Sequence, residues 1–113
     1  MNGNILTPQL EKLITSLLHA TETGAAEWLV TDTPETFGYA GHGGSVLIGK
    51  LRQGPEIQLR VLDQAGSVAD SYSGYQANLE RLFAAAERDA IDILRESPVV
   101  EALIKGLETA GAR

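Results

Sequence analysis

The sequence predicts an α+β fold in which an N-terminal helix, an antiparallel β-meander of four or five strands and two C-terminal helices form a two-layer sandwich. Apolar residues recur with a helical period near the N-terminus, with a period of two between residues 27 and 72, and again with a helical period from residue 76 onward. A sheet with one apolar face must cover that face, and amphipathic helices are the expected cover.

Length and composition favour a single α-β-α-α domain spanning residues 1–113. A chain of 113 residues that is 43% hydrophobic is long enough for one core. The absence of cysteine excludes disulfides, thiolate zinc sites and a thiol nucleophile. The net charge of −6 disfavours contact with phosphate backbones, so we expect no nucleic-acid partner. Apolar runs are short and Met1–Asn4 does not resemble a signal peptide, so we expect a cytoplasmic protein with no membrane partner.

The first helix is expected over residues 8–22. Thr7 can cap its N-terminus, Pro8 suits the first helical position, and Gly24 is a plausible stop. One apolar stripe at helical spacing supports it, namely Leu10, Leu13, Ile14, Leu17, Leu18 and Thr21.

The middle of the chain predicts consecutive antiparallel strands. Ile57, Leu59 and Val61 alternate with polar residues, which indicates a sheet with one solvated face. The stretch Ser45–Leu51 is apolar on both faces and is therefore expected at the centre. The other candidate strands are Trp28–Thr31, Phe37–Ala40, Glu56–Leu62 and Val68–Tyr72, with turns at Asp32–Glu35, Gly41–Gly44, Gln53–Pro55 and Asp63–Gly66.

Two more helices are expected over residues 76–96 and 98–110, separated by the break at Ser97-Pro98. The first helix and the long helix should cover the apolar face of the sheet. The expected core consists of Leu13, Leu17, Val46, Ile48, Leu59, Val61, Leu82, Phe83 and Leu94.

The sequence contains few candidate catalytic or metal-binding residues. His42 lies in the glycine-rich run Gly41–Ser45, which we interpret as a hairpin with positive φ at two or three positions. His19 and His42 are too few for a metal site, so we expect no metal and no cofactor. Carboxylate pairs such as Asp89 and Asp92 are expected to lie on the solvated surface.

Aromatic and apolar residues are better candidates for a binding surface. We expect Trp28 and Phe37 in the core, whereas the tyrosines could lie in the core or at the surface. The last helix has an apolar stripe that the sheet does not need, so it either extends the core or faces another chain. The candidate interaction surface is Tyr39, Tyr72, Tyr75, Val100, Leu103, Ile104 and Leu107.

The function favoured by the sequence is therefore a small, bacterial-type, non-catalytic protein-interaction module, such as an adaptor, an immunity-like protein or an accessory subunit. Its partner would be another protein or a second copy of itself, and a homodimer through the last helix is one form of this hypothesis. The alternative is a small hydrolase or transferase that uses His42 and a carboxylate in a pocket at the glycine-rich hairpin.

Overall fold

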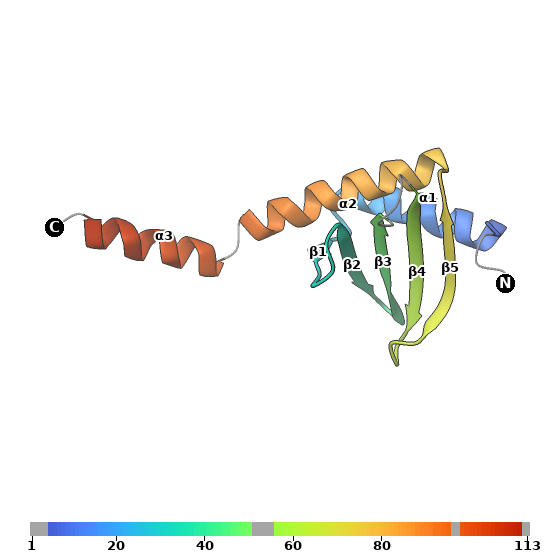
Figure 1. Ribbon diagram of the computed structural model, residues 1–113, viewed down its shortest axis with the longest axis horizontal. Coiled ribbons are helices and arrows are strands. Elements are labelled where there is room, and N and C mark those ends of the chain that lie inside the picture. The colour runs from blue at the N-terminus through green and yellow to red at the C-terminus, as the bar shows by residue number, and fades with distance from the viewer. Residues whose placement is uncertain (1–4, 51–55, 96–97, 112–113) are drawn as a thin grey trace.

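A five-stranded antiparallel sheet covered on one face by two helices forms the body of the protein (Figure 1). The structure is a computed structural model that describes residues 5–50, 56–95 and 98–111. The predicted α+β fold is confirmed. In chain order the elements are α1 (Pro8–Glu22), β1 (Leu29–Val30), β2 (Thr36–Gly41), β3 (Gly44–Lys50), β4 (Ile57–Asp63), β5 (Val68–Gly74), α2 (Ala77–Arg95) and α3 (Pro98–Gly111).

Helix α1 begins and ends as the sequence predicts. The Thr7 hydroxyl accepts a hydrogen bond from the backbone N–H of Leu10 at 3.1 Å, and Pro8 occupies the first turn. After the last turn, Gly24 has a φ of +83°, a conformation that glycine adopts at little cost.

The sheet is a meander in the order β1-β2-β3-β4-β5, so β3 is the central strand, as predicted. Val46 pairs with Val61 and Ile48 pairs with Leu59, which places these apolar residues on the same face. Leu47 pairs with Arg60 on the opposite face. A shift of one residue in this register would exchange the two faces, so the alternation specifies the pairing. The expected turn at Gln53–Pro55 lies outside the described residues.

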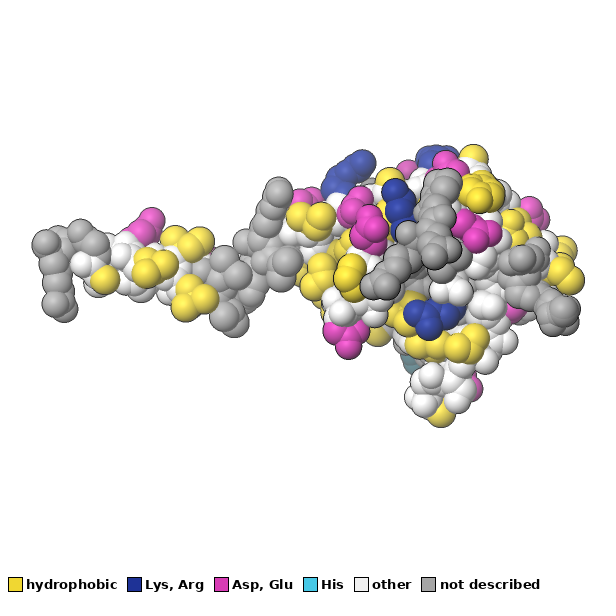
Figure 2. Space-filling view, in the orientation of Figure 1, with side chains coloured by type: hydrophobic (Ala, Val, Ile, Leu, Met, Phe, Trp, Pro, Cys, Tyr) yellow, Lys and Arg dark blue, Asp and Glu magenta, His cyan; other side chains and the backbone are white. Residues whose placement is uncertain are grey.

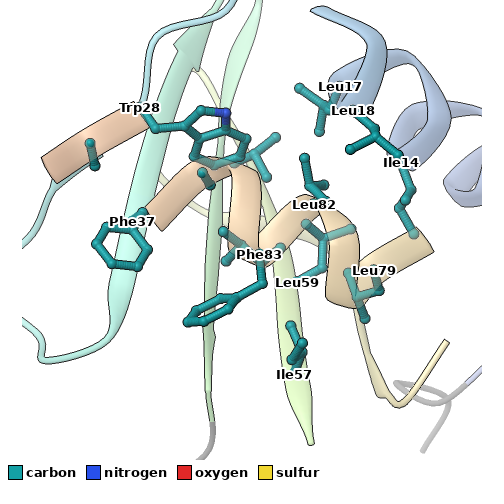
Figure 3. Close-up of a cluster of buried hydrophobic side chains, with 14 of the residues drawn as sticks. Ile14, Leu17, Leu18, Trp28, Phe37, Ile57, Leu59, Leu79, Leu82 and Phe83 are labelled. Carbon is teal, nitrogen blue, oxygen red and sulfur yellow. The ribbon is translucent and has the colours of Figure 1, made fainter. Parts of the chain in front are cut away.

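The core lies between the inner face of the sheet and helices α1 and α2 (Figure 3). Trp28 is fully buried, and the rings of Phe37 and Phe83 pack with their centroids 5.8 Å apart. Both Trp28 and Phe37 are thus core residues, as predicted. The buried hydrophobic residues also include Leu10, Ile14, Leu17, Leu18, Val46, Ile48, Ile57, Leu59, Leu79 and Leu82.

Two residues of the expected core are only half-buried, so that part of the core prediction is wrong. Leu13 on α1 and Val61 on β4 pack against the core but keep part of their surface exposed. The physical reason is that both residues line one open groove beside α1. The side chain of Leu94 lies outside the described residues.

Helix α3 takes no part in the two layers. It extends past the β1 edge of the sheet, away from the body, and the molecule measures 62 × 32 × 27 Å along its principal axes (Figure 1). All residues from 101 to 110 are exposed. In the described part of the chain, no helix combines the length and the apolar character needed to cross a bilayer.

Replacing Leu59 with Ala should destabilise the protein by about 2–5 kcal/mol, because Leu59 is fully buried and its truncation leaves a cavity. The matched control is Val68→Ala, at a strand position that is 57% exposed, and it should change stability by less than about 0.5 kcal/mol. Denaturant unfolding measures both. Equal losses in the two variants would show that the inner face of the sheet is misassigned.

Candidate functional site

Among the described helices, α3 exposes the most apolar surface. We call its three exposed aliphatic residues, Leu103, Ile104 and Leu107, the α3 stripe. Leu103 is 62% exposed, Ile104 is 49% exposed and Leu107 is 73% exposed. Figure 2 shows apolar side chains along this projecting helix. Leu107 lies four residues after Leu103 and three residues after Ile104, so the three side chains share one face of the helix.

Helix α3 has a length at which an isolated helix is only marginally stable. Isolated helices shorter than about 12–15 residues are marginal in water, and α3 has 14. Gly106 in its interior costs about 1 kcal/mol relative to Ala. The pair Glu101 and Lys105, 3.8 Å apart and largely exposed, adds little. Since helices in proteins are stabilised mainly by packing an apolar face, the Leu103 stripe requires a surface to cover it.

A second feature is an open groove of about 530 Å³ between α1 and the ends of β2, β3 and β4. Its apolar lining includes the half-buried Leu13 and Val61 and part of the Tyr39 ring. Exposed Ser16 on α1 lies at its border. We name this hollow the α1 groove. Its volume falls in the range of roughly 300–1,000 Å³ typical of sites that bury an apolar ligand.

The turn between β2 and β3 forms one wall of the α1 groove. Gly43 has a φ of +93°, and a Cβ on Gly44 would collide with the backbone carbonyl oxygen of Leu62. The hairpin interpretation is therefore confirmed, but only Gly43 has positive φ within the run, fewer than the two or three positions expected. The glycines of this turn are required by backbone geometry, and they leave a wall with few side chains beside exposed His42.

The α1 groove also brings together the groups that an enzyme would use. His42, Asp63 and Tyr39 all line it. One oxygen of Asp63, Oδ1, accepts hydrogen bonds from the N–H groups of Ala65 at 2.9 Å and Ser67 at 3.0 Å, which closes the β4–β5 turn. No hydrogen bond joins His42 to Asp63 or Tyr39 in the described structure, so the three groups do not form an acid–base relay there.

The described residues contain no cluster of three or more histidine, aspartate or glutamate side chains suited to a metal ion. His19 lies exposed on α1 and does not line the α1 groove, so the two histidines occupy separate places. A further hollow of about 280 Å³ lies over β3, β4 and the turn that precedes β2, and it is lined by Lys50, Arg60 and Glu35 among others. Its mixed charges indicate no single class of ligand.

The three tyrosines occupy three different environments. Tyr39 is half-buried, and its ring lies 5.7 Å from that of Trp28, centroid to centroid, while it also lines the α1 groove. Tyr72 is half-buried on β5 against the core. Tyr75 is 60% exposed at the start of the segment that leads into α2. The candidate interaction residues thus lie in four places: Tyr39 in the groove, Tyr72 at the margin of the core, Tyr75 at an exposed position before α2, and the others on the α3 stripe. The side chain of Val100 lies outside the described residues.

The expectation that Asp89 is a surface carboxylate is wrong. Its Oδ2 atom accepts a hydrogen bond from the backbone N–H of Trp28 at 2.7 Å, in a part-buried position. This contact links α2 to the segment that precedes β1, and it gives the carboxylate a structural role. Asp92, one turn further along α2, is exposed as expected.

Comparison of the chain with protein-family models, with curated proteins and with solved structures finds no match. The α3 stripe and the α1 groove are therefore the features of the molecule that bear on its function.

Replacing Asp89 with Ala should lower the free energy of unfolding by about 1–3 kcal/mol, because the part-buried N–H of Trp28 loses its acceptor. Asp92→Ala removes the same charge from an exposed position of the same helix and should change stability by less than about 0.5 kcal/mol. Urea denaturation compares the two. If both variants lose the same stability, the effect is one of charge and the hydrogen bond contributes nothing.

Proposed function

We propose that this chain is a cytoplasmic, non-catalytic protein-interaction module of the adaptor, immunity-like or accessory-subunit type, and that α3 is its binding element. The observation that carries the proposal is that every residue from 101 to 110 is exposed, including three large aliphatic side chains on one face of the helix. Exposed apolar surface of this kind is typical of sites that bind other macromolecules.

The spacing of the stripe matches a common mode of recognition. Helices that bind in apolar grooves use anchors at positions i, i+3, i+4 and i+7. Val100, Leu103, Ile104 and Leu107 have this spacing in the sequence. The expected complement is therefore an elongated apolar groove on a folded partner.

The size of the stripe limits how it can be used. Burying a Leu or Ile side chain completely contributes about 1.5–3 kcal/mol, so the exposed parts of Leu103, Ile104 and Leu107 together contribute about 3–5 kcal/mol. Association costs about 4–15 kcal/mol in lost translational and rotational freedom. One stripe by itself is thus insufficient, and a stable complex must bury further surface.

A small hydrolase or transferase is the second candidate, and one observation favours it: His42, Asp63 and Tyr39 line the same groove. The geometry supports it less well, because one oxygen of Asp63 is engaged in the turn and His42 is exposed. A screen with chromogenic ester and phosphoester substrates tests it directly. Turnover by the wild type that His42→Ala abolishes would favour the enzyme over the interaction module.

The double substitution Leu103→Glu and Leu107→Glu should abolish association of the protein with itself. The dilute variant should be as stable as the dilute wild type. Both side chains are exposed, so the isolated fold loses no packing, whereas any interface that covers them must accommodate two unpaired carboxylates. Analytical ultracentrifugation measures association, and thermal unfolding of the dilute protein measures the fold. Glu101→Gln and Glu108→Gln together form the control, since both residues are exposed on the same helix.

Two results would contradict the proposal. Association unaffected by the double substitution would show that α3 is not the binding element. A large fall in the melting midpoint of the dilute double variant would show that the stripe packs within its own chain.

A further inference from the structure

The two edges of the sheet differ in length. Strand β1 has two residues, and an edge strand as short as this offers little for another strand to pair with. Strand β5 has seven residues, and within the described ranges β4 is its neighbour on one side only. Figure 1 shows β5 at the margin of the sheet, with no described strand beyond it. The outer side of β5 is therefore the long edge to which a further strand could add.

Alternate residues of β5 direct their backbone groups away from β4. In an antiparallel pair, residues that exchange hydrogen bonds with the neighbouring strand alternate with residues that do not. Ser71 lies opposite Arg60, and its backbone N–H donates to Oδ1 of Asp70 at 2.8 Å. This donor therefore points to the outer edge, as does that of Ser73, two residues further along. Such outward groups are the ones that an added strand binds.

We propose that Asp70 closes this edge: its carboxylate occupies the outward N–H of Ser71 and thereby prevents β5 of one copy from pairing with β5 of another. The edges of two copies are identical, so antiparallel pairing of β5 with β5 across a twofold axis is self-complementary and is the contact that must be prevented. The inference is independent of the proposed role of α3. It assigns to Asp70 the task of keeping the sheet from continuing between chains.

The surroundings of Asp70 leave its carboxylate available for this task. Asp70 is exposed, and the ion pairs formed within the described ranges involve other residues. A strand that adds to β5 must displace the carboxylate from the N–H of Ser71. The new interface must also accommodate the displaced negative charge, which is costly unless the charge finds another partner. Charged side chains on edge strands hinder pairing in this way.

A β-bulge beside Asp70 impairs the rest of the edge. Asp70 pairs with Val61, whereas Val68 pairs with Leu62, so Ala69 is an extra residue in β5. A bulge bends the strand and increases its twist, which makes an edge a poorer template for another strand. The regular part of the edge thus begins after the bulge, and the N–H of Ser71 is the first outward donor in it. Asp70 occupies that donor.

The remaining residues of β5 would favour pairing if the edge were open. Val68 is 57% exposed and Tyr72 is half-buried, and both residue types are enriched in strands. Asp70 is the one charged residue between Val68 and Gly74, and this segment contains no proline. Segments with high strand propensity, low charge and no proline are prone to pair with copies of themselves. Removal of the Asp70 carboxylate should therefore open the edge.

The test compares Asp70→Ala with Asp92→Ala by analytical ultracentrifugation. Both chains also carry Leu103→Glu and Leu107→Glu, so that association through α3 does not contribute. Asp92 is an exposed carboxylate on α2, and its removal reproduces the change in net charge. The Asp70→Ala chain should self-associate with a dissociation constant at least about tenfold below that of the control, since a hydrogen bond to a charged group is worth a factor of roughly 10–100.

A third chain, Asp70→Asn in the same background, separates the hydrogen bond from the charge. The asparagine keeps a side-chain oxygen that can accept from the N–H of Ser71, so this chain should associate as weakly as the Asp92→Ala control. Hydrogen–deuterium exchange locates the contact: in concentrated Asp70→Ala protein, the amides of Ser71 and Ser73 should gain protection relative to a dilute sample. Thermal unfolding of each dilute chain checks that the fold is intact.

Three outcomes would overturn the inference. Equal association of the Asp70→Ala and Asp92→Ala chains would show that Asp70 does not close the edge. Association of the Asp70→Asn chain as strong as that of Asp70→Ala would show that the hydrogen bond to Ser71 is not the cause. Protection gained outside β5 alone would show that the copies meet at another surface.

Discussion

The burial of Trp28 connects every layer of this structure. The residue is fully buried just before β1, and its backbone N–H donates to Asp89 on α2 at 2.7 Å. Its indole Nε1 donates to the hydroxyl of Thr21 on α1 at 2.8 Å, and its ring packs 5.7 Å from that of Tyr39 on β2. One residue thus links both covering helices to the sheet, through its backbone N–H and through its side chain.

The two covering helices leave some apolar surface exposed in the described part of the chain. Helices α1 and α2 cover one face of the sheet, but the ends of β2, β3 and β4 leave an open groove beside α1, where Leu13 and Val61 stay half-buried. The direction of α2 carries α3 beyond β1, where its stripe has no partner in the described part of the chain. The two surfaces differ in shape, since one is a helix face and the other a hollow, and both are largely apolar.

Periodicity and local chemistry were sufficient to predict the elements from the sequence. Capping by Thr7 marks the start of α1, and the apolar pattern of β3 marks the central strand, because both signals are local. The contact between Asp89 and Trp28 spans 61 residues, and no local pattern reveals it. The α1 groove could not be predicted either. The sequence indicates that Leu13 lies on the inward face of α1, but it does not indicate how far the covering helices extend over the strands. Helix α3 was predicted with its stripe, and its exposure depends on tertiary placement.

Hydrogen–deuterium exchange as a function of protein concentration tests the central claim most directly. A 14-residue helix with its apolar face exposed should exchange almost as fast as an unstructured peptide. If α3 binds another copy of the chain, its amides should be unprotected in dilute protein and gain protection as concentration rises. Protection of α3 that is already complete in dilute monomer, or that never appears in concentrated protein, would contradict the account.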